Sequence, residues 1–255
     1  MWCFIAFSVA IAAQQCFCQI CCTPDQWTAD MFLDYGTVYI DRKKDVPNTS
    51  YSYINGTIKA TYDYPNQRSY VNLRGAEVFP LVPGPSVPYH ATIINDYKNG
   101  MQYDIKPDGS CEKERLGNMT KQCIPKDAKL VNTGSLAMEW NKVENYKFAI
   151  NDDSMSVDAT VSRNLPSSSC NPVHVVYFIG SAEYDSGAMI NLDVLNVVPY
   201  NTDPSVFHIP PQCRNARFKV RRSLTIDRIT HNYSFIILDF AFVLQTRYFL
   251  QIYRS

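Results

Sequence analysis

The segment "ATIINDYKNGMQYDI", residues 91–105, decides the class of fold that the sequence predicts. Two short runs rich in Ile, Thr and Tyr flank the dipeptide Asn99-Gly100. Both residues of that dipeptide tolerate positive φ, so the pair favours a tight turn between antiparallel strands. The segment therefore predicts a β-hairpin.

Other segments have the same composition of Tyr, Val, Ile and Thr with partial alternation, which is typical of strands. They are "GTVYIDR" (36–42), "YSYINGTIKATYDY" (51–64) and "SYVNLRGAEVF" (69–79). Two further hairpins are predicted, with turns at Asn151–Asp153 and near Asp185–Gly187. The only short candidates for helices are "DQWTADMFLDY" (25–35) and "PKDAKL" (125–130). The residues thus predict an antiparallel β protein whose sheet is curled or stacked to cover one side.

The composition fits a folded domain without general attraction to nucleic acid. Apolar residues make up 46% of the 255-residue chain, and 24 basic residues balance 24 acidic ones. The segment 214–255 holds eight of the basic and two of the acidic residues, a net charge of +6, which leaves −6 on the rest. Its apolar run Phe235–Leu244 is too short to span a bilayer, which takes roughly 20 residues. This extension is interpreted as a docked strand or amphipathic segment, a membrane-surface contact, or an artefact of gene prediction.

The N-terminus "MWCFIAFSVAIAAQQ" is an uncharged apolar run that ends in small residues. It predicts a signal peptide over residues 1–13, because a membrane anchor would need a longer run. Removal of Cys3 with this segment leaves eight cysteines, an even number that indicates up to four disulfides in an oxidising compartment. The glycosylation sequons at Asn48, Asn55, Asn118 and Asn232 agree with secretion.

The chemical motifs of common enzymes and metal sites are missing. Cys18-Gln-Ile-Cys21 is a lone CxxC without a second pair, which argues against structural zinc. The sequence contains no G-x-S-x-G elbow, P-loop or dinucleotide fingerprint. His174 alternates with Val173 and Val175, as expected of a structural histidine in a strand. Asp152, Asp153 and Asp158 could supply oxygen ligands to calcium, although a solvated turn explains them as well.

Several motifs, taken in order, resemble the ependymin-related family of secreted glycoproteins. They run from Cys22 to Cys213 and read "CCTPDQW", "YDYPNQR", "DYKNGMQYDI", "CIPKDA", "SCNPV" and "DPSVFHIPPQC". The resemblance implies two stacked antiparallel sheets that enclose an apolar pocket, similar to bacterial lipoprotein-carrier folds. It also implies no catalytic residues, a lipid or other apolar ligand, calcium and extracellular-matrix associations, and a homodimer. The implied location is extracellular or lysosomal.

The resemblance further implies the disulfides Cys22–Cys170 and Cys111–Cys213. Cys16, Cys18, Cys21 and Cys123 then remain, and we assign them as Cys21–Cys123 and Cys16–Cys18. The ependymin-like domain is expected over residues 14–216, and the extension 217–255 has no counterpart in the family pattern. No short motif fixes the residues of the pocket.

Three hypotheses follow from the sequence. The first is a secreted, disulfide-bonded carrier or matrix-contact protein that binds an apolar ligand without converting it. The second is a purely adhesive, calcium-responsive glycoprotein whose pocket is vestigial. The third, a secreted hydrolase, would need a polar cleft with one of the four histidines beside a nucleophile.

Overall fold

The structure is a computed structural model that describes residues 19–41, 48–78, 80, 85–136, 141–150, 155–163, 169–181, 186–200 and 203–218. The predicted signal peptide, Cys16, Cys18 and the extension beyond residue 218 lie outside these described residues. The predicted boundary after residue 13 also lies outside them, the one after residue 216 lies near their end, and both stay predictions.

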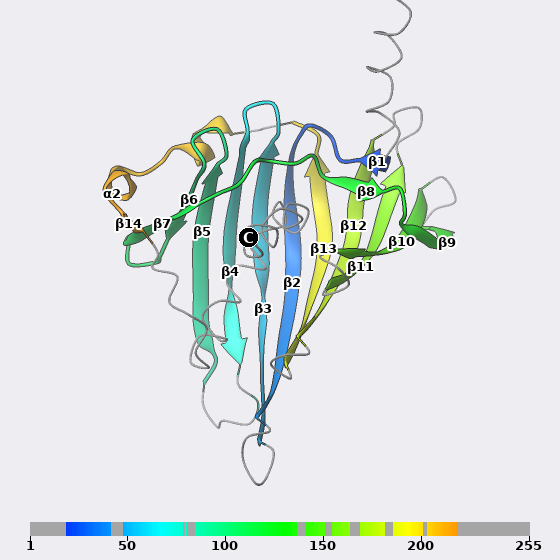
Figure 1. Ribbon diagram of the computed structural model, residues 1–255, viewed down its shortest axis with the longest axis horizontal. Helices are drawn as coiled ribbons and strands as arrows, with labels where there is room; N and C mark the ends of the chain where they lie inside the picture. The colour runs from blue at the N-terminus through cyan, green and yellow to red at the C-terminus, as the bar shows by residue number, and fades with distance from the viewer. Residues whose placement is uncertain are drawn as a thin grey trace, which may run out of the picture.

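Within the described ranges the chain is strand almost throughout (Figure 1). The elements are β1 (Gln19–Cys22), β2 (Gln26–Asp41), β3 (Asn48–Asp63), β4 (Arg68–Val78), β5 (Val87–Asp96), β6 (Met101–Ile105), β7 (Cys111–Arg115), β8 (Cys123–Pro125), β9 (Lys129–Ser135), β10 (Lys142–Ile150), β11 (Met155–Arg163), β12 (Cys170–Ser181), β13 (Ser186–Val198), η2 (Pro204–Phe207), α2 (Pro211–Arg214) and β14 (Arg217–Phe218).

The described strands form one large sheet and one small sheet. The large sheet has twelve strands in the order β14-β7-β6-β5-β4-β3-β2-β13-β12-β11-β10-β9, and the small sheet pairs β1 with β8. Within the large sheet, the chain starts near the centre with β2 and meanders to one side as far as β7. It then crosses to the opposite edge and meanders back from β9 to β13, which lies beside β2. The crossover, which carries β8, passes in front of the large sheet in Figure 1. All pairings in the large sheet are antiparallel except the short β14–β7 contact.

One face of the large sheet, the inner face, carries the core. On β2 the inner residues are Trp27, Ala29, Met31, Leu33 and Tyr35, all at most 5% exposed. Their neighbours on the other strands are apolar in the same registers. Since alternate strand residues point to opposite faces, the other set of side chains forms an exposed outer face.

Gly56 and Gly75 face one another across β3 and β4, where the two backbones approach very closely. A Cβ atom on Gly56 would lie 2.5 Å from the carbonyl oxygen of Arg74, and one on Gly75 would lie 2.5 Å from that of Asn55. No side chain fits at either position, so glycine is required for this approach of the strands.

The predicted fold class, a mainly β protein of two antiparallel sheets, is confirmed. The two sheets are unequal, because the second has only two strands. The segment at residues 25–35 is a strand rather than a helix: all but its first residue lie in β2. Residues 125–130 are not a helix either: they run from the last residue of β8 through a turn into the first two residues of β9.

The hairpin predicted for residues 91–105 is present as β5 and β6, with Asp96 paired to Met101. Its turn has four residues rather than two. Gly100 has φ +64°, whereas Asn99 is not at positive φ and instead donates its backbone N–H to Asp96 at 3.1 Å. The other two predicted hairpins are β10–β11 and β12–β13. Their turn residues 151–154 and 182–185 lie outside the described residues.

Candidate ligand-binding cavity

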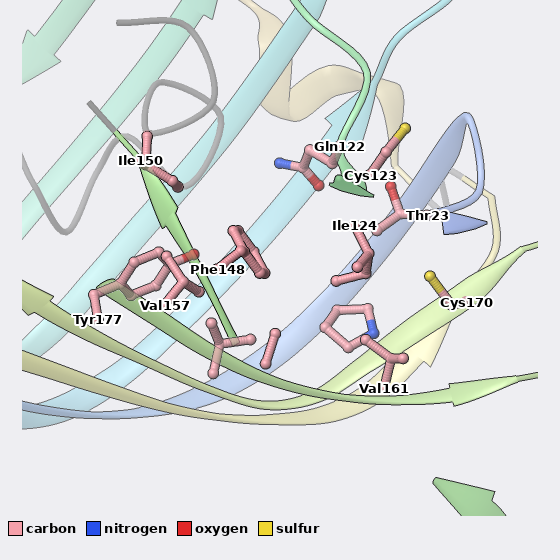
Figure 2. A pocket seen from close by; sticks show the side chains of 13 residues that line it. Thr23, Gln122, Cys123, Ile124, Phe148, Ile150, Val157, Val161, Cys170 and Tyr177 are labelled. Carbon is pink, nitrogen blue, oxygen red and sulfur yellow. The ribbon is translucent and has the colours of Figure 1, made fainter. Parts of the chain in front are cut away.

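An apolar cavity lies between the small sheet and one end of the large sheet (Figure 2). Its floor is the inner face of β11 and β12, one wall is β10, and its roof is the small sheet with the residues beside it. The lining residues are Thr23, Gln122, Cys123, Ile124, Phe148, Ile150, Val157, Ala159, Val161, Cys170, Pro172, Val175 and Tyr177. The cavity measures about 70 Å³, room for roughly five water-sized groups.

Small side chains on the floor make this space. Val157, Ala159 and Val161 alternate along β11, each at most 3% exposed, so all three point inward. Val175 and Tyr177 continue the floor on β12 in the paired registers. Burial raises the pKa of Tyr177, so its phenol stays neutral at physiological pH.

One disulfide joins the roof to the rest of the protein, and a second one lies within the roof. Cys22 pairs with Cys123 within the small sheet, and Cys21 pairs with Cys170 on the large sheet. The backbone N–H of Thr23 also donates to the carbonyl oxygen of Gln122 at 2.9 Å. The roof is thus linked covalently to the floor.

The predicted partners of Cys21 and Cys22 are exchanged, so the pairings Cys22–Cys170 and Cys21–Cys123 were wrong. Adjacent residues of a strand point to opposite sides. Cys22 is the register partner of Cys123, with Cα atoms 3.9 Å apart, while Cys21 faces Cys170 at 5.8 Å. The third predicted bridge, Cys111–Cys213, is present in the structure.

A polar cluster borders the cavity at the Cys170 end of the floor. Arg163 Nε lies 2.6 Å from Glu144 Oε2, and Arg163 Nη2 donates to the Tyr146 hydroxyl at 3.0 Å. That hydroxyl donates to Glu144 Oε2 at 2.6 Å. Burial and the hydrogen bond to Glu144 raise the pKa of Tyr146, so the phenol keeps its proton.

Of the three calcium candidates, the structure describes only Asp158. Asp158 lies on β11 and points to the outer face, where Asn145 donates to its carboxylate and Lys147 Nζ lies 3.3 Å away. Asp152 and Asp153 lie outside the described residues. Among the described residues no group of three or more His, Cys, Asp or Glu side chains is placed to hold a metal ion.

The sequons occupy different settings. Asn118 is exposed on the connection between β7 and β8. Asn55 is exposed on the outer face of β3, and its Nδ2 donates to Asp34 at 2.6 Å. Asn48 begins β3, and Asn232 lies outside the described residues.

The described histidines lie away from the cavity lining. His90 contacts Asn72 at 3.1 Å, and His174 contacts Asp193 at 2.7 Å. His208 follows η2 and is exposed. His174 is therefore a paired strand residue, as its alternation predicted, and the lining that the described residues provide has no histidine–nucleophile arrangement of the kind a hydrolase would need.

Sequence reasoning could not name the cavity residues. The available signal was the run of small inward residues in "MSVDATVSR", which has the alternation of a half-buried strand. That signal predicts a buried face but not an empty space above it. The space depends on where the roof crosses the floor, and the roof comes from residues 19–23 and 122–125.

Comparisons with solved structures found proteins of low sequence identity. An uncharacterized conserved protein from Thermus thermophilus is 10% identical with a TM-score of 0.41, covering 85% of this chain and 99% of its own. A LolA superfamily protein from Nitrosomonas europaea is 9% identical with a TM-score of 0.30, covering 74% and 93%. A DUF1329 family protein from Desulfovibrio piger is 6% identical with a TM-score of 0.21, covering 80% and 96%.

None of the curated proteins compared matches the chain in sequence. In the part of the chain that the structure describes, no helix is long and apolar enough to cross a membrane. The family model for Ependymin matches residues 86–213. This range runs from the start of β5, through the crossover and the cavity floor, to the buried Cys213. Since the match covers half of the 255 residues, the chain belongs to the ependymin family.

Proposed function

We propose that this protein binds the alkyl part of a lipid or another apolar molecule in the cavity between its two sheets. The observation that carries the proposal is the cavity itself. Nearly all of its lining is aliphatic, aromatic or disulfide, and the roof is linked to the floor by the Cys21–Cys170 bridge. An apolar, largely preformed hollow is the usual form of a site for small hydrophobic ligands.

The size of the cavity limits how strongly it can bind by itself. Burial of a CH₂ group contributes about 0.8 kcal/mol. Five such groups would contribute about 4 kcal/mol, which corresponds to a dissociation constant of about 1 mM. A ligand bound more tightly than this must extend beyond the described cavity or make polar contacts at its border.

Binding without conversion is the form of the proposal. The polar side chains of the lining are Thr23, Gln122 and Tyr177, and the two lining cysteines are in disulfides. None of these groups is a general base near neutral pH, and Tyr177 is held in its neutral form. A carrier or presenting role needs no more than reversible burial.

We place this function outside the cell. Three disulfides in the described residues fit an oxidising compartment, as do family membership and the predicted signal peptide. Glycosylation, with Asn55 and Asn118 as exposed described acceptors, belongs to the same proposal. Matrix contact, calcium binding, a homodimer and a lysosomal location stay predictions of the family resemblance.

Native mass spectrometry of the secreted protein tests the proposal. We expect co-purified apolar molecules, or uptake of added lipid after delipidation. Ala159→Trp should block uptake, because Ala159 lies on the cavity floor. Ala149→Trp is the matched control, since Ala149 is exposed on the neighbouring strand. Equal lipid uptake by the two variants would refute the cavity as the binding site.

A further inference from the structure

The polar cluster of Glu144, Tyr146 and Arg163 is set directly against the cavity. Each member is the cross-strand partner of a lining residue. Tyr146 pairs with Ala159, Glu144 with Val161, and Arg163 with Cys170. Directly opposite residues on one face of a sheet have Cβ atoms roughly 5 Å apart. The cluster therefore adjoins the apolar lining on the same face of the sheet.

The charged ends of the cluster are accessible, while its phenol is buried. Tyr146 is 4% exposed, whereas the side chains of Arg163 and Glu144 are 36% and 27% exposed. The buried hydroxyl fixes both charged groups, because it accepts from Arg163 and donates to Glu144. The cluster thus extends from the buried interior to solvent at one end of the cavity.

Hydrogen-bonding capacity is left over on both charged groups. The ion pair uses Arg163 Nε and Glu144 Oε2, and the tyrosine uses Arg163 Nη2 and the same carboxylate oxygen. Within the described part of the chain, Arg163 Nη1 and Glu144 Oε1 have no partner. Arg163 Nη1 offers hydrogen-bond donors and Glu144 Oε1 offers an acceptor at the same border of the cavity.

We propose that this cluster is the head-group site for an uncharged amphiphile that carries hydroxyl groups, of the monoacylglycerol class. This inference rests on the proposed function of the cavity and names its ligand class. A hydroxyl group of the ligand donates to Glu144 Oε1, and a hydroxyl or ester oxygen accepts from Arg163 Nη1. The alkyl chain enters the cavity over Val161 and Ala159.

Glu144 makes the site select against carboxylates. A carboxylate head group near Arg163 would also lie near Glu144, whose negative charge is held 2.6 Å from the guanidinium. Attraction to one charge and repulsion from the other largely cancel. The cost of removing the carboxylate from water would then remain uncompensated. An uncharged head group has a smaller desolvation cost and satisfies both partners.

The test uses three ligands with the same eight-carbon acyl chain, each displacing the uncharged fluorescent probe N-phenyl-1-naphthylamine from the secreted protein. The ligands are 1-octanoylglycerol, methyl octanoate and octanoate. We expect 1-octanoylglycerol to bind about tenfold more tightly than methyl octanoate, the ratio that one or two additional hydrogen bonds supply. Octanoate should bind more weakly than 1-octanoylglycerol by at least the same factor.

Glu144→Gln distinguishes a binding role from a merely structural one. It removes the charge and keeps the shape, so octanoate should gain about tenfold in affinity relative to methyl octanoate. The matched control is Glu112→Gln on β7, which removes a carboxylate from a similarly exposed ion pair with Lys106. That variant should leave the ranking of the ligands unaltered. Thermal unfolding of each variant verifies that it is folded.

The outcomes separate this inference from the proposed function. Equal affinities for the three ligands would overturn the head-group site while leaving the apolar cavity in place. Octanoate as the tightest ligand of the wild-type protein would overturn it in favour of an anion site. Failure to bind the probe and all three ligands would refute the cavity function itself, and the head-group site with it.

Discussion

The inner face of the large sheet has two halves. In both of them inward and outward residues alternate along the strands, but one half is closely packed and the other contains the cavity. The packed half, on β2 to β5, brings together large side chains such as Leu33, Leu73 and Ile93, all at most 1% exposed. The cavity half, on β10 to β12, places smaller residues such as Ala159 and Val161 beneath the small sheet. Among the described residues, none of the lining side chains comes from β2 to β5. A preformed hollow therefore needs both a floor of small residues and a roof held at a fixed place.

The largest effect on stability is expected when the disulfide that links the roof to the floor is removed. Replacement of Cys21 and Cys170 together by Ser opens a loop of 149 residues and should lower the free energy of unfolding by about 4 to 5 kcal/mol. Because this bridge links the roof to the floor, binding of an apolar probe should be lost as well. Urea unfolding and probe titration measure the two effects.

The bridge outside the cavity half is the control. Cys111–Cys213 closes a similar loop of 102 residues, between β7 and α2. Its replacement by two serines should destabilise the protein by about as much. The folded fraction should keep its affinity for the probe. If both double variants lost binding equally, the roof would have no special role in maintaining the cavity.

The second effect concerns the packed half, where Asp63 is fully buried at the end of β3. Its carboxylate accepts from Gln26 at 2.8 Å, from Asn66 at 2.9 Å and from Arg68 at 2.7 Å. Asp63→Ala leaves these donors without their acceptor and should cost about 3 kcal/mol of stability. Probe binding in the cavity half should be unchanged. A large loss of binding would mean that the two halves are coupled.

The same residue predicts a pH dependence. Burial alone would raise the pKa of Asp63, but the hydrogen bonds from Gln26, Asn66 and Arg68 outweigh it and hold the pKa below its ordinary value. The stabilisation from this carboxylate is therefore complete above the pKa of an unfolded Asp, about 3.9. It is lost as the pH falls from there through the lower pKa of the folded state. Unfolding titrations below about pH 4 should bring wild type and Asp63→Ala closer together, and a constant difference would contradict this account.

The sequence could predict the parts of the fold that depend on local pattern. The β5–β6 hairpin followed from its strand residues and from Gly100, which does adopt positive φ. The start of β2 was missed because Phe32 is apolar yet 54% exposed on the outer face. Because residues 31, 32 and 33 are all apolar, the alternation of apolar and polar residues that marks a strand is hidden, and a short helix fits the sequence equally well.

The candidate site depends on contacts between distant segments, which local pattern does not contain. Cys21 and Cys22 are adjacent, so only the register of β1 with β8 determines which of them faces the large sheet. The cavity likewise depends on the crossover that places Ile124 over Val157 and Ala159. The two cysteines of each disulfide lie 101 to 149 residues apart in the chain. The family motifs contain most of the cysteines that form disulfides, but they do not determine the orientation of the roof.

The smallest expected effect on stability comes from a matched pair of substitutions, Val157→Phe and Val71→Phe. Both valines are on the inner face, at 2% and 6% exposed. Val71 lies between Ala60 and Ile93 in the packed half, where a larger side chain should cost about 1 to 3 kcal/mol of stability. Val157 borders the cavity, so the phenyl ring of the Val157→Phe variant can enter open space, and the change in unfolding free energy should stay below about 1 kcal/mol.

The affinity for the probe should change in the opposite order, with at least a roughly tenfold loss for Val157→Phe and little change for Val71→Phe. Equal destabilisation by both substitutions would mean that the cavity half is packed as tightly as the other, and that the space between floor and roof is closed in solution.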